Sequence, residues 1–84
     1  MKTAENKLRL PSTIGRGRDS TIMLRPPLVS RLHCELYEQD GQLMVRDLGS
    51  LNGTFINNQK ITESSLPPGE LLTVGTVTFR AVYD

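Results

Sequence analysis

The chain has 84 residues, of which 37% are hydrophobic and 23% are charged, and its formal net charge is +1. A chain of this length has room for one small hydrophobic core, so we expect a single domain over residues 1–84. The composition excludes a disordered chain, and no apolar run approaches the ~20 residues that a membrane-spanning helix needs.

Apolar residues alternate with a period of two along the chain, which is the pattern of β-strands. Turn signals separate the alternating segments at Asp40-Gly41, Asn57-Asn58 and Pro67-Pro68-Gly69. No segment has a helical apolar stripe, so the sequence predicts an all-β sandwich. In chain order, the predicted strands cover Lys7–Leu10, Thr13–Gly15, Thr21–Leu24, Cys34–Glu38, Gln42–Arg46, Thr54–Ile56, Leu71–Val74 and Val77–Val82.

Charge is distributed unevenly along the chain. Residues 1–34 hold seven basic and two acidic side chains, whereas residues 35–84 hold three basic and seven acidic ones. The first half therefore carries a local positive field that would attract an anionic partner. The same counts also fit an ordinary solvated surface of mixed charge.

Three loop segments combine arginine, hydroxyl, amide and glycine residues. They are Gly15-Arg16, Ser30-Arg31-Leu32-His33 and Asp47–Thr54. A planar guanidinium offers a fork of donors that matches a phosphate, and serine hydroxyls and loop N–H groups can bind the remaining oxygens. Together the three segments predict a site that holds a phosphate beside a peptide.

Other chemistries fit these segments less well. Gly15-Arg16-Gly17-Arg18 lacks the third glycine of a dinucleotide-binding loop, and a strand is predicted after it where that loop needs a helix. Ser30 and His33 lie three positions apart on an extended chain, which does not set a hydroxyl against an imidazole, so we expect no enzyme and no catalytic residue. His33 and Cys34 are too few for a zinc site, so no metal or cofactor is predicted, and Cys34 is expected to be a buried, inert thiol.

In order and spacing, the three segments resemble the forkhead-associated (FHA) domain, a module that binds phosphothreonine. The resemblance extends from about Thr13 to Val82. It implies a β-sandwich of mostly antiparallel short strands, with a shortened amino-terminal hairpin because few residues precede Gly15. By the same match, Arg16 and Ser30 bind the phosphate. Arg31 lies at the loop rim and contacts the phosphate or the peptide backbone.

The resemblance also implies roles for the loop that follows Asp47. Asn52 would hold the main chain of the peptide, because a carboxamide both donates and accepts hydrogen bonds. Ser50 and Leu51 belong to the same binding loop, although Leu51 stands where some members carry threonine and offers only its N–H. Three residues would support the site: Gly15 before the arginine, His33 as a hydrogen-bonding buttress behind the loop, and Gly53 in a backbone conformation barred to other residues.

We therefore expect a cytoplasmic, monomeric module that binds a threonine-phosphorylated protein or peptide, with no membrane partner. The alternative is a phosphate-independent structural or assembly module that uses the faces or edges of the same sandwich. A nucleic-acid binder is a third candidate, motivated by the basic first half, but the four aromatic residues leave no stacking platform, so no nucleic-acid partner is expected. Convergence of the loops after Gly15 and Leu24 requires Thr21–Leu24 to be a short crossing strand.

Overall fold

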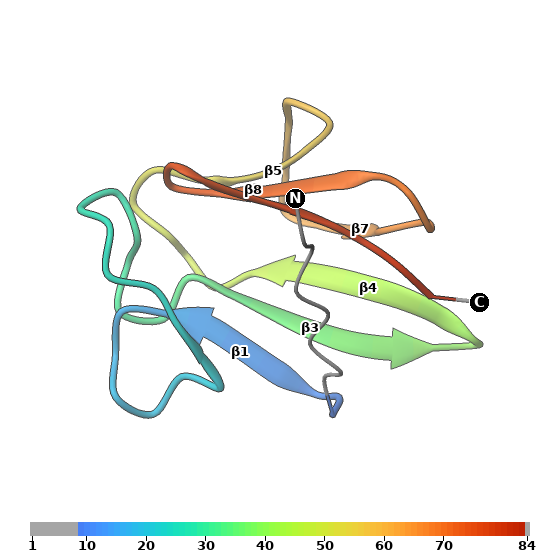
Figure 1. The fold of residues 1–84 in the computed structure, drawn as a ribbon, viewed down its shortest axis with the longest axis horizontal. Helices are drawn as coiled ribbons and strands as arrows, with labels where there is room; N and C mark the ends of the chain where they lie inside the picture. The colour runs from blue at the N-terminus through green and yellow to red at the C-terminus, as the bar shows by residue number, and fades with distance from the viewer. Residues whose placement is uncertain (1–8, 84) are drawn as a thin grey trace, which may run out of the picture.

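The computed structural model describes residues 9–83, and within that range it consists of strands, turns and loops. Two sheets pack face to face as two layers, which confirms the predicted all-β sandwich (Figure 1). Among these residues the structure contains no helix that could cross a membrane. The strands are β1 (Ser12–Gly15), β2 (Ile22–Met23), β3 (Cys34–Gln39), β4 (Gln42–Asp47), β5 (Thr54–Ile56), β6 (Gln59–Ile61), β7 (Glu63–Ser65), β8 (Leu71–Val74) and β9 (Val77–Arg80).

The strand order is β2-β1-β3-β4-β7 in one sheet and β6-β5-β8-β9 in the other. Two-residue turns close two of the hairpins. Asp40 and Gly41, with φ of 52° and 78°, join β3 to β4, and Asn57 and Asn58, with φ of 49° and 68°, join β5 to β6. Asparagine, aspartate and glycine tolerate positive φ better than other residues, so these turns form where the sequence predicts them.

The pairing of β1 with β2 is parallel, with Ile14 opposite Ile22 and Gly15 opposite Met23. The chain doubles back between them, and the Thr13 and Thr21 side chains each accept a hydrogen bond from the other residue's N–H, at 3.1 and 3.2 Å respectively. Because parallel strands end at the same edge of a sheet, the loops that follow β1 and β2 leave from the same end of the sandwich. The short crossing strand that loop convergence requires is thus present.

Some predicted boundaries are wrong. Strand β9 ends at Arg80, because the next residue, Ala81, hydrogen-bonds to the loop residues Gly69 and Glu70. The sequence analysis misses β6 and β7, which lie at sheet edges, are three residues long and are mostly polar. Solvent covers one side of such strands, so they show little alternation of apolar and polar residues.

The predicted strand Lys7–Leu10 falls only partly within the described residues. Lys7 and Leu8 lie outside them, and Arg9 and Leu10 are not part of a strand. Pro11 follows, and proline has no N–H to donate to a sheet. The shortened amino-terminal hairpin that the resemblance implies falls on this stretch, so it also lies largely outside the described residues.

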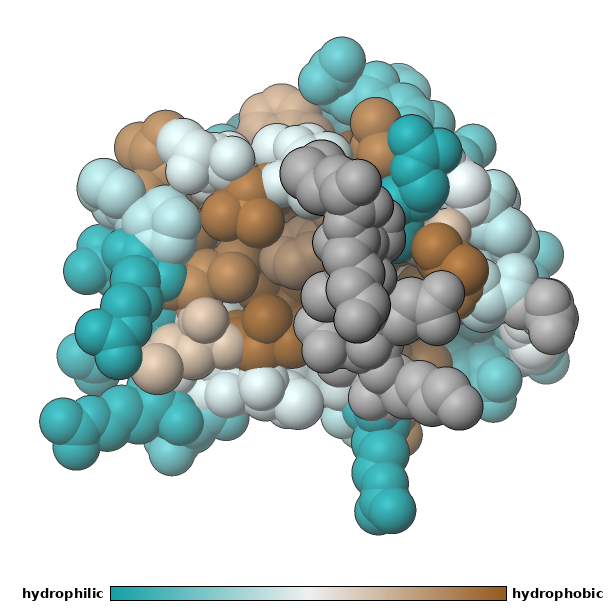
Figure 2. Space-filling model, in the orientation of Figure 1, coloured by the Kyte–Doolittle hydropathy of each residue, from teal (hydrophilic) through white to brown (hydrophobic). Residues whose placement is uncertain are grey.

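The core fills the space between the two layers and draws side chains from both sheets (Figure 2). Cys34 is fully buried in it, and burial raises the pKa of its thiol to about 12. The prediction that Cys34 is buried is confirmed, and a protonated, buried thiol is a poor nucleophile. The buried core residues are Ile14, Val29, Cys34, Leu36, Val45, Ile56, Leu66, Leu72, Val74 and Ala81.

Four connections meet at one end of the sandwich, at the left in Figure 1. They are the β1–β2 loop, the long β2–β3 loop, the β4–β5 loop and the β8–β9 turn. The turn contacts the β2–β3 loop, because a Cβ added to Gly75 would lie 2.8 Å from Val29 and 3.4 Å from Leu28. Hydrophilic side chains project from this end of the molecule in Figure 2.

Candidate functional site

Backbone hydrogen bonds join the β1–β2 loop to the β2–β3 loop. The Arg16 N–H donates to the carbonyl of Ser30 at 3.0 Å, and the Gly17 N–H donates to the carbonyl of Arg31 at 3.0 Å. Gly15 makes this close approach possible, since a Cβ at that position would lie 2.1 Å from the Arg31 carbonyl oxygen. The two arginine-bearing segments are therefore fixed side by side through their main chains.

His33 ties the β2–β3 loop to the β4–β5 loop from inside the molecule. Its side chain is fully buried, and its Nδ1 accepts a hydrogen bond from the Ser30 N–H at 3.0 Å. Its other ring nitrogen, Nε2, lies 2.8 Å from the Gly53 carbonyl oxygen. Because an N–H can only donate and a carbonyl can only accept, the ring is the neutral tautomer with its proton on Nε2.

The Ser30 hydroxyl meets the β4–β5 loop from the other side. Its Oγ accepts a hydrogen bond from the Leu51 N–H at 3.0 Å, and the Asn52 amide nitrogen donates to the Leu28 carbonyl at 3.2 Å. The carbonyl and hydroxyl of Ser30 thus bond to two other loops, and its N–H bonds to His33 within its own loop. This set of contacts, here named the Ser30 junction, consists of Ser30 with its partners Arg16, His33 and Leu51.

Asp47 shapes the β4–β5 loop from its base. Its carboxylate accepts hydrogen bonds from the N–H groups of Gly49 and Ser50, both at 3.1 Å, and from the Thr54 hydroxyl at 2.7 Å. The Ser50 hydroxyl also donates to it, and accepts from the Gly53 N–H at 3.0 Å. Burial alone would raise the pKa of the Asp47 carboxyl, but the hydrogen bonds from Ser50 and Thr54 outweigh it and hold the pKa below its usual value.

The structure brings the nine predicted site residues to this one end, but it gives them different positions. The side chains of Arg16, Arg31, Leu51 and Asn52 are exposed, and Leu51 is 87% exposed. The Ser50 hydroxyl is turned into its own loop, toward Asp47 and Gly53. Gly53 has a φ of 92°, a conformation that favours glycine.

Sequence reasoning gives no role to Asp47 or Thr54, although both organise the binding loop. The signal was present in Asp47-Leu48-Gly49-Ser50, because an aspartate before a glycine and a serine is typical of a turn in which the carboxylate accepts N–H groups two and three residues on. Thr54 has no comparable local signal. Its hydroxyl reaches Asp47 across seven positions, and only the fold sets that distance.

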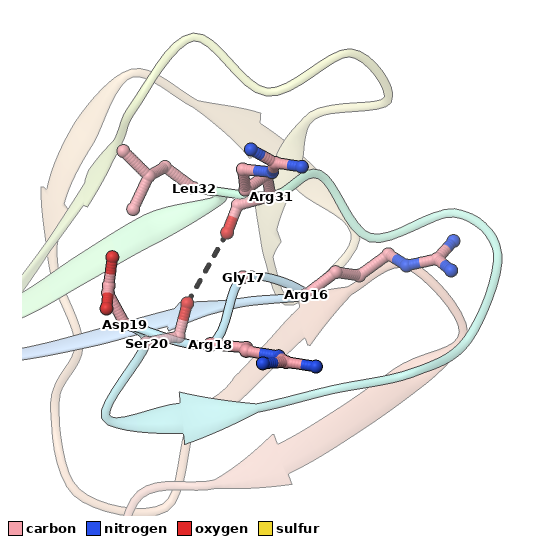
Figure 3. A pocket seen from close by; sticks show the side chains of 7 residues that line it. All are labelled: Arg16, Gly17, Arg18, Asp19, Ser20, Arg31 and Leu32. Atoms are coloured by element: carbon pink, nitrogen blue, oxygen red, sulfur yellow. Dashed lines mark hydrogen bonds between the residues drawn. The ribbon is translucent and has the colours of Figure 1, made fainter.

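Within residues 9–83, no carboxylate forms an ion pair with the arginines of this end. Among residues 9–83 the one ion pair joins Arg46 to Glu35, on the strands β4 and β3. The same residues contain no group of three side chains that could hold a metal ion. An open hollow of about 660 Å³ lies beside the arginines (Figure 3), and its lining residues are Arg16, Gly17, Arg18, Asp19, Ser20, Arg31 and Leu32.

The chain is similar to an enzyme inhibitor and to a regulator of glycogen accumulation. It is 40% identical to the oxoglutarate dehydrogenase inhibitor of Corynebacterium diphtheriae, over 89% of this chain and 51% of that protein. It is 38% identical to the glycogen accumulation regulator GarA of Mycolicibacterium smegmatis, over 86% of this chain and 44% of that protein. The chain therefore spans about half the length of these relatives.

Solved structures of FHA domains superpose on this chain. The FHA domain of FhaA, in complex with the intracellular domain of Rv3910, superposes with a TM-score of 0.79 at 35% identity, over 87% of this chain and 81% of that one. A structure from a study of phosphothreonine-dependent FHA domain interactions superposes with a TM-score of 0.85 at 33% identity, over 92% of this chain and 81% of that one. The family model of the FHA domain matches residues 12–75. This chain belongs to the FHA domain family.

Proposed function

We propose that this domain binds threonine-phosphorylated proteins and so mediates interactions that depend on phosphorylation. The observation that carries the proposal is the Ser30 junction, which fixes the backbones of Arg16 and Leu51 beside Ser30, with Arg31 next in the chain. An arginine fork, a hydroxyl and a loop N–H are the donors that a phosphate dianion needs.

The relatives support the same ligand. One neighbouring FHA structure comes from work on phosphothreonine-dependent interactions, and another, EmbR of Mycobacterium tuberculosis, contains a phosphopeptide and superposes with a TM-score of 0.79 at 25% identity. We infer a similar ligand for this chain. Arg16 and Ser30 bind its phosphate, Arg31 and the Leu51 N–H add contacts, and Asn52 exchanges its bond with Leu28 for the main chain of the peptide.

The same geometry favours binding without catalysis. Both ring nitrogens of His33 are engaged, one by the Ser30 N–H and the other by the Gly53 carbonyl. The imidazole is therefore not available to remove a proton from the Ser30 hydroxyl, as a serine hydrolase would require. We infer that the domain recognises its phosphorylated partner and leaves it unaltered.

Titration with three matched peptides tests the proposal. The peptides carry phosphothreonine, phosphoserine or unmodified threonine at one position, and binding is measured by calorimetry. We expect the unmodified peptide to bind at least a hundredfold more weakly, because the charge-assisted bonds to Arg16 and Ser30 are lost. Binding that ignores the phosphate would overturn the proposal and favour an assembly module that uses the sheet edges.

A further inference from the structure

The hollow beside the Ser30 junction is lined by one arginine, Arg18, to which the proposed function assigns no contact with the ligand. Arg18 lines it together with Arg16 and Arg31. All three side chains are exposed, and none is in an ion pair within residues 9–83. The hollow therefore combines a concave surface with more positive charge than one bound phosphate requires.

The one carboxylate in the lining does not cancel this charge. Asp19 is exposed, and it makes no ion pair with the three arginines. In Figure 3 its carboxylate lies on one side of the hollow, whereas the guanidinium groups of Arg16 and Arg18 extend toward the other. Three guanidinium groups and one carboxylate leave a net positive charge in a depression, where low-dielectric walls strengthen the local potential.

The backbone that carries Arg18 is fixed beside the β2–β3 loop. A hydrogen bond of 3.1 Å from the Ser20 N–H to the Gly17 carbonyl closes a turn with Arg18 and Asp19 at its centre. The Gly17 N–H and the Ser20 hydroxyl both donate to the Arg31 carbonyl, at 3.0 and 3.4 Å. Arg18 is thus held close to Arg31 by the main chain, and only its own side chain remains free to move.

We propose that Arg18 binds a second anionic group on the same ligand, in a residue that flanks the phosphothreonine. This inference rests on the proposed function. A phosphate of charge near −2 is matched by Arg16 and Arg31, so the guanidinium of Arg18 is left to pair with a further acceptor. The ligand class is an extended peptide with phosphothreonine beside a glutamate, an aspartate or a second phosphorylated residue.

A double-mutant cycle tests the assignment. Phosphothreonine peptides are prepared with neutral flanks, with one glutamate moved through each flanking position, and with phosphoserine at the best of these positions. We expect the wild type to bind the best glutamate peptide about threefold, and the doubly phosphorylated peptide about tenfold, more tightly than the neutral one. In Arg18→Gln both gains should fall below twofold.

Arg80→Ala is the matched control, because it removes the same charge far from the site. Arg80 lies at the far end of β9 from the Gly75 turn, and its side chain donates to the Gly69 carbonyl at 3.4 Å. This variant should keep the full gain from an acidic flank. Equal gains in Arg18→Gln and the wild type would overturn the assignment of Arg18, and so would an equal loss in Arg80→Ala.

The peptides also distinguish a carboxylate from a second phosphate as the anion that Arg18 binds. They distinguish failure of the Arg18 proposal from failure of the proposed function. If only phosphoserine raises the affinity, and Arg18→Gln removes that gain, the ligand of Arg18 is a second phosphate. If glutamate and phosphoserine both raise the affinity, Arg18 accepts any anionic side chain. If the neutral phosphopeptide binds but no acidic flank raises its affinity, the role of Arg18 is overturned and the proposed function is not. Failure of the neutral phosphopeptide to bind better than its unmodified form overturns the proposed function itself.

Discussion

Ser30 engages each of its polar groups with a different residue, so the shape of the site depends on a residue whose side chain is among the smallest present. Its N–H donates to His33, its carbonyl accepts from Arg16, and its hydroxyl accepts from the Leu51 N–H. These bonds also set where the backbones of the charged neighbours Arg16 and Arg31 lie. Replacements at individual positions should therefore separate residues that contact ligand from residues that hold others in place.

Arg16→Ala should weaken binding of a phosphothreonine peptide by ~2 kcal/mol or more, because a charge-assisted hydrogen bond is lost from a site that is otherwise formed. Thermal melting should be unchanged, since the exposed side chain makes no ion pair within residues 9–83. Arg16→Lys should restore part of the affinity, because an ammonium supplies charge without the planar fork. Calorimetric titration of the three proteins gives the comparison, and equal affinity in the Ala variant would remove Arg16 from the site.

Gly15→Ala should lower stability and binding together. The added methyl would lie 2.1 Å from the Arg31 carbonyl oxygen, so the two arginine loops must move apart. We expect a loss of about 1–3 kcal/mol of unfolding free energy, as for other overpacked positions. Gly17→Ala is the milder comparison, because its methyl would lie 2.8 Å from Cγ of the Arg31 side chain and 3.1 Å from the Arg31 carbonyl oxygen, a full ångström farther than at Gly15. Equal melting of the two variants would show that the close approach at Gly15 is not needed.

At the scale of elements, the sequence predicts structure best where local chemistry decides it. The turns Asp40-Gly41 and Asn57-Asn58 form where they are predicted, because their positive φ suits these residues. The second turn also implies a strand after it, and β6 follows directly, although its polar residues do not reveal it. The parallel pairing of β1 with β2 has no local signal, since it depends on how the chain doubles back.

The site also divides into residues that local sequence reveals and residues that only the fold brings into place. The nine predicted residues come from short motifs that can be recognised in sequence. The contributors that were missed, Asp47 and Thr54, depend on positions that the fold supplies: a carboxylate at the base of a loop and a hydroxyl that reaches it across seven positions. A sequence shows that a serine and a histidine are three positions apart, but only the structure shows that the histidine bonds the serine's backbone and leaves its hydroxyl alone.

His33→Ala and Ser30→Ala should affect different properties. Loss of the buried His33 ring removes one hydrogen bond within the β2–β3 loop and one to the β4–β5 loop, and it leaves a cavity, so we expect a loss of about 2–4 kcal/mol in unfolding free energy. Ser30→Ala should cost about 1 kcal/mol in phosphopeptide binding with little change in melting, because water can replace its exposed bond to Leu51. Denaturant unfolding and peptide titration measure the two effects. A His33→Ala protein that melts like the wild type but no longer binds would mean that the ring contacts ligand.

Asp47 should make stability depend on pH in the acid range. Its pKa in the folded state lies below the ordinary value of 3.8, so the unfolded chain binds the proton more tightly. The stabilising contribution is therefore fully present above the unfolded pKa and is lost as the pH falls through the folded pKa. Unfolding free energies at pH 7 and pH 3 should show that Asp47→Asn costs about 1–2 kcal/mol at pH 7 and less at pH 3. A cost that does not change with pH would assign the effect of Asp47 to shape and not to charge.

At the scale of the whole molecule, the single cysteine offers a direct measure of opening. Cys34 is fully buried in the core between the sheets, and burial raises its pKa to about 12. A thiol reagent should therefore label it only when the sandwich opens, and the labelling rate should rise with denaturant in parallel with global unfolding. The rate in the folded protein should be at least a hundredfold below that of the unfolded chain. Labelling at the unfolded rate without denaturant would show that the core is not closed over this residue.

The main-chain bonds between the binding loops have a consequence for the speed of recognition. Three segments are already tied together through Ser30 before any ligand is present, so little of the chain has to be ordered when a phosphopeptide arrives. Encounter is then governed by diffusion and by the attraction between phosphate and arginines, which falls as salt screens it. Phosphopeptides of equal charge but different sequence will consequently associate at similar rates and differ in how long they stay bound, so that residence time carries the selectivity among them.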